Sequence, residues 1–375
     1  AETDAEVAAA FRLARAAATL GSDRAEPDQV EAVTILASEG GVGALGLLAG
    51  AAESPLPQVA AAAAKALEAV ERERAMWEMA ENVWFGLSLG SVLMLAAIGL
   101  AISFGVMGII NMAHGELVML GAYTTFAVQQ AIRLHAPELF DASLLIALPL
   151  AFLVSGAVGV AIERGICRHL YGRPLETLLA TWGVSLILQQ AVRSIFGPNN
   201  REVGNPDWMS GAFELGQLTI TYNRLWILFF ALAVFACLLV VLKRTPLGLQ
   251  MRAVTQNRRM AAAMGVRTGW VDAMTFGLGA GIAGIAGVAL SQIGNVSPNL
   301  GQAYIVDSFM VVVFGGVGNL WGALAGAMTL GIANKFLEPY AGAVLAKVLV
   351  LVFIILFIQK RPRGMFALRG RAVET

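Results

Sequence analysis

Charged residues are scarce in this sequence. Only 14% of its 375 residues are charged and 57% are hydrophobic, and the mean hydropathy is +0.70. Soluble domains average about 25% charged residues, so the composition excludes an ordinary soluble domain. Nearly uncharged windows, long enough to cross a hydrocarbon core about 30 Å thick, recur at roughly 83–104, 143–162, 225–242, 273–290 and 343–358. We therefore predict a polytopic membrane protein.

Side chains that commonly carry catalysis or bind metals are also few, with two Cys and three His. Cys167 falls in a predicted loop and Cys237 inside a predicted span, so no disulfide framework is implied. The sequence has no HExxH, no clustered Cys/His spacing and no GxSxG elbow, which argues against a metal site and against catalysis. It has no GxxxxGK[ST] phosphate loop either, so any ATP-driven step would need ATP and Mg²⁺ bound by another chain. We expect no cofactor in this chain.

Acidic and basic residues are distributed unevenly along the chain. Residues 1–82 contain fourteen acidic and six basic side chains. The segments 164–173, 243–267 and 360–371 contain three, six and five Lys or Arg and no acids. Because short cationic loops stay on the cytoplasmic side of a membrane, we predict these segments and the C-terminus inside the cell. Counting spans back then places residues 1–82 outside it.

About nine membrane segments fit this topology if one of them is short or broken. The short or broken segment is 305–316, which ends in a glycine-rich stretch at 315–319. Pro339 is expected to mark the turn after the next segment. The predicted fold is therefore all-α, a helical membrane domain at 83–359 with a cytoplasmic loop at 243–268 and a basic tail at 360–375. Its segments are expected at 83–104, 114–133, 143–163, 175–196, 225–242, 269–290, 305–316, 320–336 and 343–359.

The first 82 residues form a separate region. They begin with Ala1 in a small, acidic stretch, the kind of end that removal of an export signal leaves, although a shortened chain would begin the same way. Paired short helices with Ala and Leu faces resemble units of a HEAT-type repeat, and a loose acidic helical extension is the alternative. The helices are expected at 5–20, 28–39, 42–52 and 57–81.

Small residues recur at every fourth position in two segments. Gly277 and Gly281 form one such stripe, and Gly318, Gly322 and Gly326 form the other. Small residues let helix backbones approach closely in lipid. The stripes predict tight helix packing, and helices that slide or rock during transport are the other interpretation.

One polar cluster interrupts the apolar runs, in the stretch GVMGIINMAHGELVMLGAY at 105–123. Gly105 and Gly108 offer places to break the preceding helix. Asn111, His114 and Glu116 then fall at a turn near the inner end of the next span. Ionisable groups at membrane depth are expensive and suggest function. A hydrogen-bonded turn that holds two helices together and a direct contact with a permeating solute both remain open.

The second basic loop, at 243–266, has its own regular pattern. Pro246 suits the first turn of a helix. Five of its residues recur four or five positions apart, a spacing that predicts one side of a short helix. They are Gly248, Arg252, Asn257, Ala261 and Gly265. Docking of a soluble partner on this face and simple contact of its arginines with anionic lipid are both compatible with the composition.

These residues resemble a known family. The pattern Gly248-x3-Arg252-Ala253-x3-Asn257-x3-Ala261-x3-Gly265, with Asn-Met-Ala-His-Gly-Glu at 111–116, is similar to the membrane permeases of branched-chain amino acid ABC importers, over about 83–365. Within that family the chain looks most like the urea-type permease subunit. The similarity to that subunit is carried by 196–206, 290–322, 333–339 and 356–374, and more weakly by the acidic segment ahead of the first span.

The resemblance implies a subunit of a bacterial inner-membrane importer. Its partners would be a second homologous permease, two cytoplasmic ATPases, an external solute-binding protein and membrane lipid, with no nucleic acid. It places the helix that couples to the ATPases within 247–265, with Arg252 and Asn257 as its signature contacts. It also implies that Asp307 and Asn319 are polar members of the central path.

The main prediction is import of urea or a close amide, and three other functions stay open. Urea is small and neutral, so its path needs amides, hydroxyls and carbonyls, of which Asn111, Asn319, Gln292, Asn295 and Ser297 are candidates. Import of branched-chain or other small amino acids is the nearest alternative. An ion-coupled secondary transporter would instead use His114 and Glu116 as a proton or cation site. The last alternative is a channel.

Overall fold

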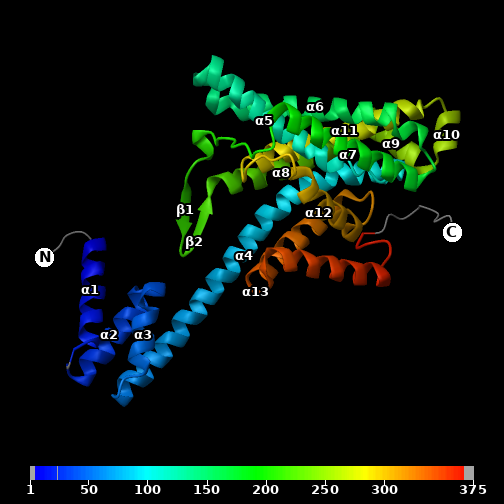
Figure 1. Ribbon diagram of the computed structural model, residues 1–375. Coiled ribbons are helices and arrows are strands. Elements are labelled where there is room, and N and C mark those ends of the chain that lie inside the picture. Colours follow the sequence, from blue (N-terminus) through cyan, green and yellow to red (C-terminus); the bar gives the residue numbers. More distant parts are fainter. Residues whose placement is uncertain (1–4, 23, 367–375) are drawn as a thin grey trace. The chain divides into compact units, whose positions relative to one another are not determined.

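The computed structural model describes residues 5–22 and 24–366, and the chain divides into two compact units, Ala1–Glu81 and Asn82–Thr375 (Figure 1). We call the first unit the extension and the second the membrane unit. Of the predicted basic tail at 360–375, residues 367–375 lie outside the described residues.

The extension has its own apolar core. It consists of helices α1 (Ala5–Leu20), α2 (Glu26–Glu39) and α3 (Leu45–Ala52), a 3-10 turn at Gly41–Ala44, and the first part of α4 (Pro57–Met107). Glu26 and Asp28 lie in the first turn of α2, where the helix dipole favours acidic groups. The core side chains come from all four helices and the 3-10 turn, and the most deeply buried are Val33, Leu36, Ala44, Leu48, Val59 and Ala63.

Helix α4 differs from the sequence-based prediction, which separated a helix at 57–81 from a span at 83–104. The structure has one uninterrupted helix of 51 residues. No glycine or proline lies between Gln58 and Phe85 to end it. Exposed pairs at four-residue spacing also stabilise this stretch, Arg72 with Glu68 and Arg74 with Glu78. The boundary between the two units therefore falls inside a helix.

The membrane unit confirms the all-α polytopic prediction. Among the described residues, five helices are long and apolar enough to cross a membrane, α4, α6, α8, α11 and α13. The membrane-unit helices are α5 (His114–His135), α6 (Ser143–Gly165), α7 (Pro174–Phe196), α8 (Tyr222–Arg244), α9 (Pro246–Gln256), α10 (Arg258–Ala263), α11 (Thr268–Ser291), α12 (Leu300–Gly315) and α13 (Leu320–Lys360), with 3-10 turns at Pro137–Ala142, Cys167–His169 and Asp207–Met209.

Burial separates central from peripheral helices in the membrane unit. In their apolar windows α4 and α11 are 83% and 89% buried, whereas α8 and α13 are 22% and 17% buried. A helix that is apolar all round and buried is a core helix, so α4 and α11 are the centre of this unit. The apolar residues left exposed on α8 and α13 are available to lipid or to a partner.

The segment predicted as a plain loop at 197–223 contains a small antiparallel hairpin. Strands β1 (Ala212–Leu215) and β2 (Leu218–Thr221) pair with Ala212 opposite Thr221, and Gly216 in the turn has a φ of 68°. Each strand is only four residues long, and β1 is exposed along its whole length. Such short strands carry too little alternation in sequence to be separated from a loop.

The glycine-rich break between α12 and α13 lies where it was predicted, but two neighbouring boundaries were wrong. Helix α12 begins at Leu300 rather than at 305. The later turn falls at Gly342, with a φ of 75°, whereas Pro339 lies inside helix α13. A left-handed backbone is open to glycine and closed to proline, so the chain reverses at Gly342.

The prediction of tight packing along the two glycine stripes holds for four of the five glycines. Gly277 and Gly281 pack against α6, where an added Cβ would meet Val160 and Phe152. On α13, Gly322 and Gly326 face Gly315 of α12. The prediction was wrong for Gly318, which lies outside the helix in the preceding turn with a φ of 78°. There it approaches Gly105 of α4.

Candidate functional site

The polar turn, defined here as residues 108–116, joins α4 to α5. Helix α4 ends at Met107 and Gly108 takes a φ of 69°, so the break falls where the sequence predicted it. Asn111 Oδ1 accepts a hydrogen bond from the Ala113 backbone N–H at 3.0 Å. His114 Nε2 lies 2.9 Å from the Ala96 carbonyl oxygen of α4. The turn is thus fastened to the helix that precedes it.

Helix α7 supplies the other side of the polar turn. The Met112 backbone N–H donates to Thr181 Oγ1 at 3.1 Å, and Ser185 Oγ donates to Glu116 Oε1 at 3.1 Å. One turn further along, Gln189 Nε2 donates to Asn299 Oδ1 at 2.9 Å, just ahead of α12. Polar residues at four-residue spacing in an apolar span are the signal that sequence reasoning missed, and they are Thr177, Thr181, Ser185 and Gln189.

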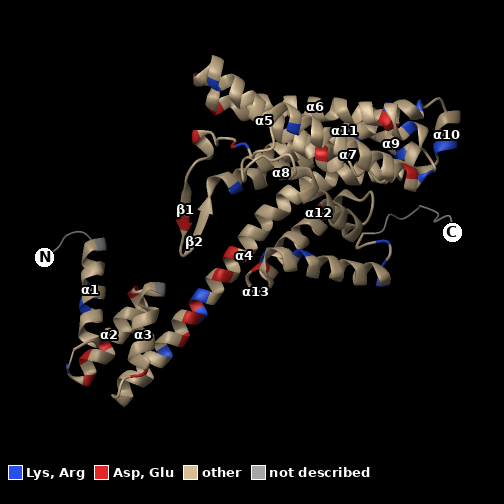
Figure 2. Cartoon of the chain, in the orientation of Figure 1, with Lys and Arg blue, Asp and Glu red and all other residues tan. Residues whose placement is uncertain are grey.

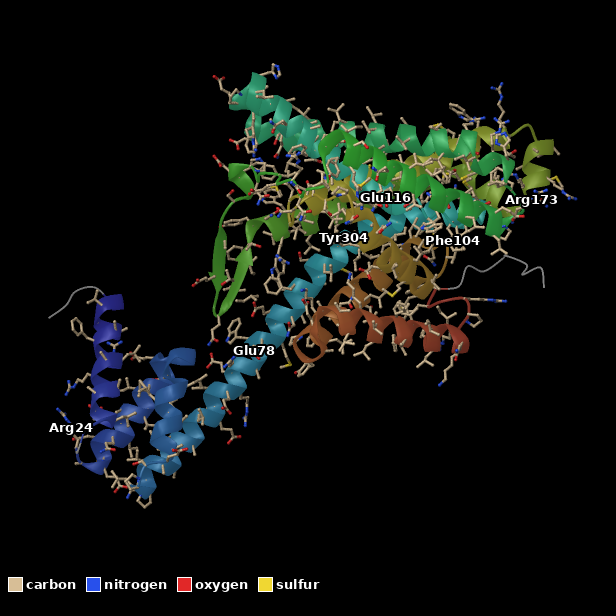
Figure 3. The ribbon with its side chains drawn as sticks, in the orientation of Figure 1. Arg24, Glu78, Phe104, Glu116, Arg173 and Tyr304 are labelled. Atoms are coloured by element: carbon tan, nitrogen blue, oxygen red, sulfur yellow. The ribbon has the colours of Figure 1, made fainter. Side chains whose placement is uncertain are left out.

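The turn lies at the start of α5, beside the middle of two neighbouring helices. Ser155, near the middle of α6, donates to the Leu117 carbonyl oxygen at 2.9 Å, and Ser185 is near the middle of α7. Figure 3 shows Glu116 in the middle of the helical bundle, far from Arg173 at one end. As predicted, the turn directly precedes the helix that begins at His114, and α5 begins beside the middle of α6 and α7. Non-helical backbone at this depth requires partners within the protein.

Two polar atoms of the turn have no hydrogen-bond partner. Asn111 Nδ2 and Glu116 Oε2 are buried and unpaired, and both side chains are 1% exposed. His114 is also 1% exposed. The side chains of Asn111, His114 and Glu116 are therefore closed to solvent in this conformation, and contact of any of them with a solute needs the surrounding helices to separate.

The structure gives Asp307 and Asn319, both expected in the path, partners within the chain. Asp307 on α12 is 7% exposed and its Oδ2 lies 2.9 Å from Lys347 Nζ on the second half of α13. Asn319 caps α13, because its Oδ1 accepts the backbone N–H groups of Trp321 and Gly322 at 3.0 and 3.2 Å. Both side chains hold α12 and α13 in place.

The second basic loop folds as two helices rather than one. Asn257, with φ −154° and ψ 99°, ends α9 and caps α10, its Oδ1 accepting the Met260 backbone N–H at 2.9 Å. Gly265, with a φ of 88°, lies beyond α10. The prediction of one helix side was therefore wrong. The capping asparagine and the left-handed glycine recur at a spacing that also fits one face of a helix. In the structure, however, both residues lie where a helix begins or ends.

Burial confirms that the pattern residues do not share one face. Gly248 and Ala261 are buried and Ala253 is half-buried, whereas Arg252, Asn257 and Gly265 are exposed. Arg252 Nη1 donates to the Leu242 carbonyl oxygen near the end of α8. Lysines and arginines gather around α9 and α10 at one end of the membrane unit (Figure 2).

Loss of the Asn257 cap has a defined expected result. In Asn257→Ala the Met260 N–H loses its acceptor, which costs about 1 kcal/mol, so we expect amide hydrogen exchange in 258–263 to speed up by about fivefold. Asn257→Asp keeps an acceptor and should exchange at the wild-type rate. Equal protection in the alanine variant would contradict the capping role.

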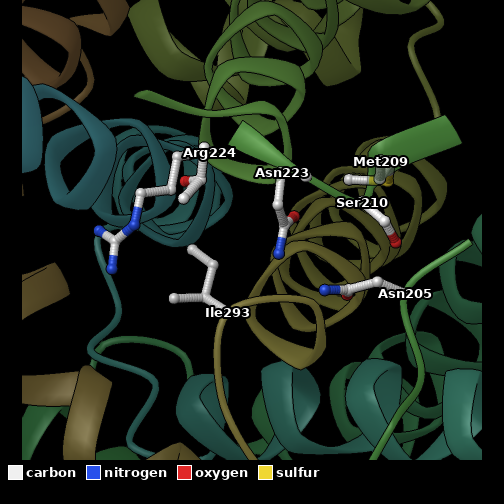
Figure 4. Close-up of a pocket in the computed structure, with 8 residues that line it drawn as sticks. Asn205, Met209, Ser210, Asn223, Arg224 and Ile293 are labelled. Atoms are coloured by element: carbon white, nitrogen blue, oxygen red, sulfur yellow. The ribbon is translucent and has the colours of Figure 1, made fainter. Parts of the chain in front are cut away.

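A small pocket lies in the membrane unit away from the basic segment α9–α10. It is lined by residues of the hairpin region, α8 and the segment after α11 (Figure 4). Its volume is about 320 Å³. Arg224 turns its guanidinium away from Asn223 and stacks on Phe85, 4.7 Å from the ring centre. The remaining lining is neutral, with amides, hydroxyls and apolar groups from Asn205, Met209, Ser210, Gly211, Thr221, Asn223 and Ile293. Such a surface suits a small solute with hydrogen-bonding groups.

A polytopic helical unit with a basic two-helix segment at one end is the architecture of a membrane transport subunit. Residues 82–358 match the family described as branched-chain amino acid transport system / permease component, and the chain belongs to this family. The resemblance inferred from the motifs is thus confirmed at the level of the family. The chain is a transport component rather than an enzyme.

Individual relatives agree with this assignment. Over 286 residues the chain is 31% identical to the high-affinity branched-chain amino acid transport system permease protein BraD of Pseudomonas aeruginosa, covering 74% of this chain and 92% of BraD. It is 32% identical over 296 residues to the corresponding protein LivH of Salmonella typhimurium, covering 76% of this chain and 94% of LivH. No solved structure matches the chain.

Proposed function

We propose that this chain is the path-forming permease subunit of an ATP-driven importer of branched-chain or similar small amino acids. The observation that carries the proposal is the family match over nearly the whole membrane unit, together with relatives that are branched-chain amino acid permeases. The sequence has no phosphate loop, so the ATPases would be separate chains.

Urea or a close amide is the second candidate solute. The relatives do not favour it. The specific observation in its favour is that, apart from Arg224, the lining of the pocket in Figure 4 is uncharged, and Asn205 contributes to it from one of the stretches that resemble the urea-type subunit. An amino acid would call for groups that meet a carboxylate and an ammonium, whereas amides and hydroxyls suffice for urea.

The proposed assembly contains a second homologous permease, two cytoplasmic ATPases and an external binding protein. The basic segment α9–α10 would dock on an ATPase, since it presents Arg252, Arg259 and Met260 on its exposed surface. This orientation puts the extension outside the cell and the C-terminus inside, in a bacterial inner membrane. The polar turn would border the path and hold α4, α5 and α7 together beside it.

Uptake by proteoliposomes tests the function. We expect the complex that co-purifies with this chain from native membranes to import radiolabelled leucine when its binding protein and ATP are supplied, and the chain alone to import nothing. Import of urea but not leucine would favour the second candidate. Uptake by the chain alone would contradict the proposal and favour an ion-coupled transporter or a channel.

Thiol labelling tests the orientation. Cys167 is fully buried, so a maleimide should not reach its thiol. With Cys237→Ser as background, Arg259→Cys should resist a membrane-impermeant maleimide in intact cells and react after lysis. Glu71→Cys in the extension should react in intact cells once the outer membrane is permeabilised. The reverse pattern would overturn the orientation.

A further inference from the structure

A cluster of charged and aromatic side chains joins the basic segment to the helices of the membrane unit. Arg258, the first residue of α10, donates from Nη1 to Asp272 Oδ1 at 3.2 Å and from Nη2 to Oδ2. Asp272 lies in α11 and its side chain is 0% exposed, whereas that of Arg258 is 42% exposed. A two-pronged arginine–carboxylate pair fixes both planar groups in one relative orientation.

Tyr171 extends the cluster to α6. The Arg258 guanidinium lies over the Tyr171 ring, 4.8 Å from its centre, and Tyr171 Oη donates to Glu163 Oε1 at 2.9 Å. Glu163 is 1% exposed and is located near the end of α6. Burial raises the pKa of Tyr171 above its usual range, helped by the charges of Asp272 and Glu163, so the hydroxyl keeps the proton that it donates.

The helices reached by this cluster lead toward the polar turn. Helix α11 packs against α6 through Gly277 and Gly281, and further along it Gly284 lies against Gly121 of α5. A displacement of α10 cannot change its angle to α11 without breaking two hydrogen bonds to a buried carboxylate. Helix α9 packs against both α8 and α11, and its Arg252 donates to the Leu242 carbonyl oxygen rather than to a carboxylate of α11.

We propose that Arg258, clamped between Asp272 and Tyr171, is the positioning residue through which movement of the basic segment reaches α6 and α11. The inference rests on the proposed function, since it presumes an ATPase that moves this segment. A gain in protein stability does not by itself explain such a pair, because proteins in which a buried ion pair is replaced by well-packed apolar residues are often no less stable. What an apolar pair lacks is the fixed angle between α10 and α11.

That difference defines the test. In proteoliposomes containing the co-purified complex, we would measure leucine and urea imported per ATP hydrolysed for Arg258→Met/Asp272→Leu. We expect a folded complex that still hydrolyses ATP while solute import per ATP falls by about 3- to 30-fold. Arg258→Lys keeps the charge but not the paired hydrogen bonds or the stacking, and should give an intermediate value.

The matched control is Arg173→Met, since Arg173 is an exposed arginine of the first basic loop and belongs neither to the clamp nor to the docking segment α9–α10. It should import as much solute per ATP as the wild type. Unchanged import per ATP in the Arg258→Met/Asp272→Leu complex would overturn the clamp and leave the proposed function standing. A wild-type complex without ATP-dependent import would overturn the proposed function, and the clamp with it.

Discussion

Replacing Gly121 with leucine is expected to prevent the membrane unit from folding stably. A Cβ at this position would overlap the backbone oxygen and carbon atoms of Gly284 on α11. Backbone cannot move aside as a flexible side chain can, so α5 and α11 would have to separate where they cross. Overpacking of a well-packed core costs about 1–3 kcal/mol, and a clash with backbone should lie at or beyond the upper end.

The measurement is the thermal unfolding midpoint of the protein in detergent, with size-exclusion chromatography to detect aggregation. Gly183→Leu on α7 is the matched control, because a Cβ there meets nothing within 4 Å. We expect the control to unfold near the wild-type temperature. Similar midpoints for both leucine variants would show that α5 and α11 do not approach as closely as the structure has them.

Replacing Lys347 with methionine is expected to destabilise the contact between α12 and α13. It leaves the Asp307 carboxylate 7% exposed and without its partner. Removing one member of a buried pair costs about 3–5 kcal/mol, and the half-exposed lysine lowers our expectation to about 2 kcal/mol. Asp307→Asn/Lys347→Met removes both charges and should recover most of that loss, as read from the free energy of unfolding in denaturant.

The same variants test whether Asp307 belongs to the solute path. If its main task is the pairing with Lys347, the Asp307→Asn/Lys347→Met complex should import solute at close to the wild-type rate. A folded double variant that has lost import would instead identify Asp307 as a path residue. A Lys347→Met protein as stable as the wild type would contradict the pairing.

Several features of this protein followed from the sequence because they depend on local composition. Uncharged runs predicted the spans of α4, α6, α8, α11 and α13, since water and lipid sort residues by polarity wherever they lie in the fold. The breaks at Gly108 and at Gly316 were predictable for a similar reason, because only glycine takes the left-handed backbone that they need. The motifs likewise sufficed to identify the family.

Tertiary contacts decided the rest. The spacing of Arg252, Asn257 and Gly265 is compatible with a helical face, and only the capping hydrogen bond from the Met260 N–H to Asn257 Oδ1 showed two helices instead. The sequence placed Glu116 near the end of a span, and only the hydrogen bond from Ser155 Oγ to the Leu117 carbonyl oxygen showed that this end lies beside the middle of α6. Arg258 looked like any loop arginine until the fold brought Asp272, fourteen residues away, and Tyr171 against it. Periodicity records which residues share an element, but depth and partnership depend on how separate elements pack, and one helix's spacing does not encode its neighbours.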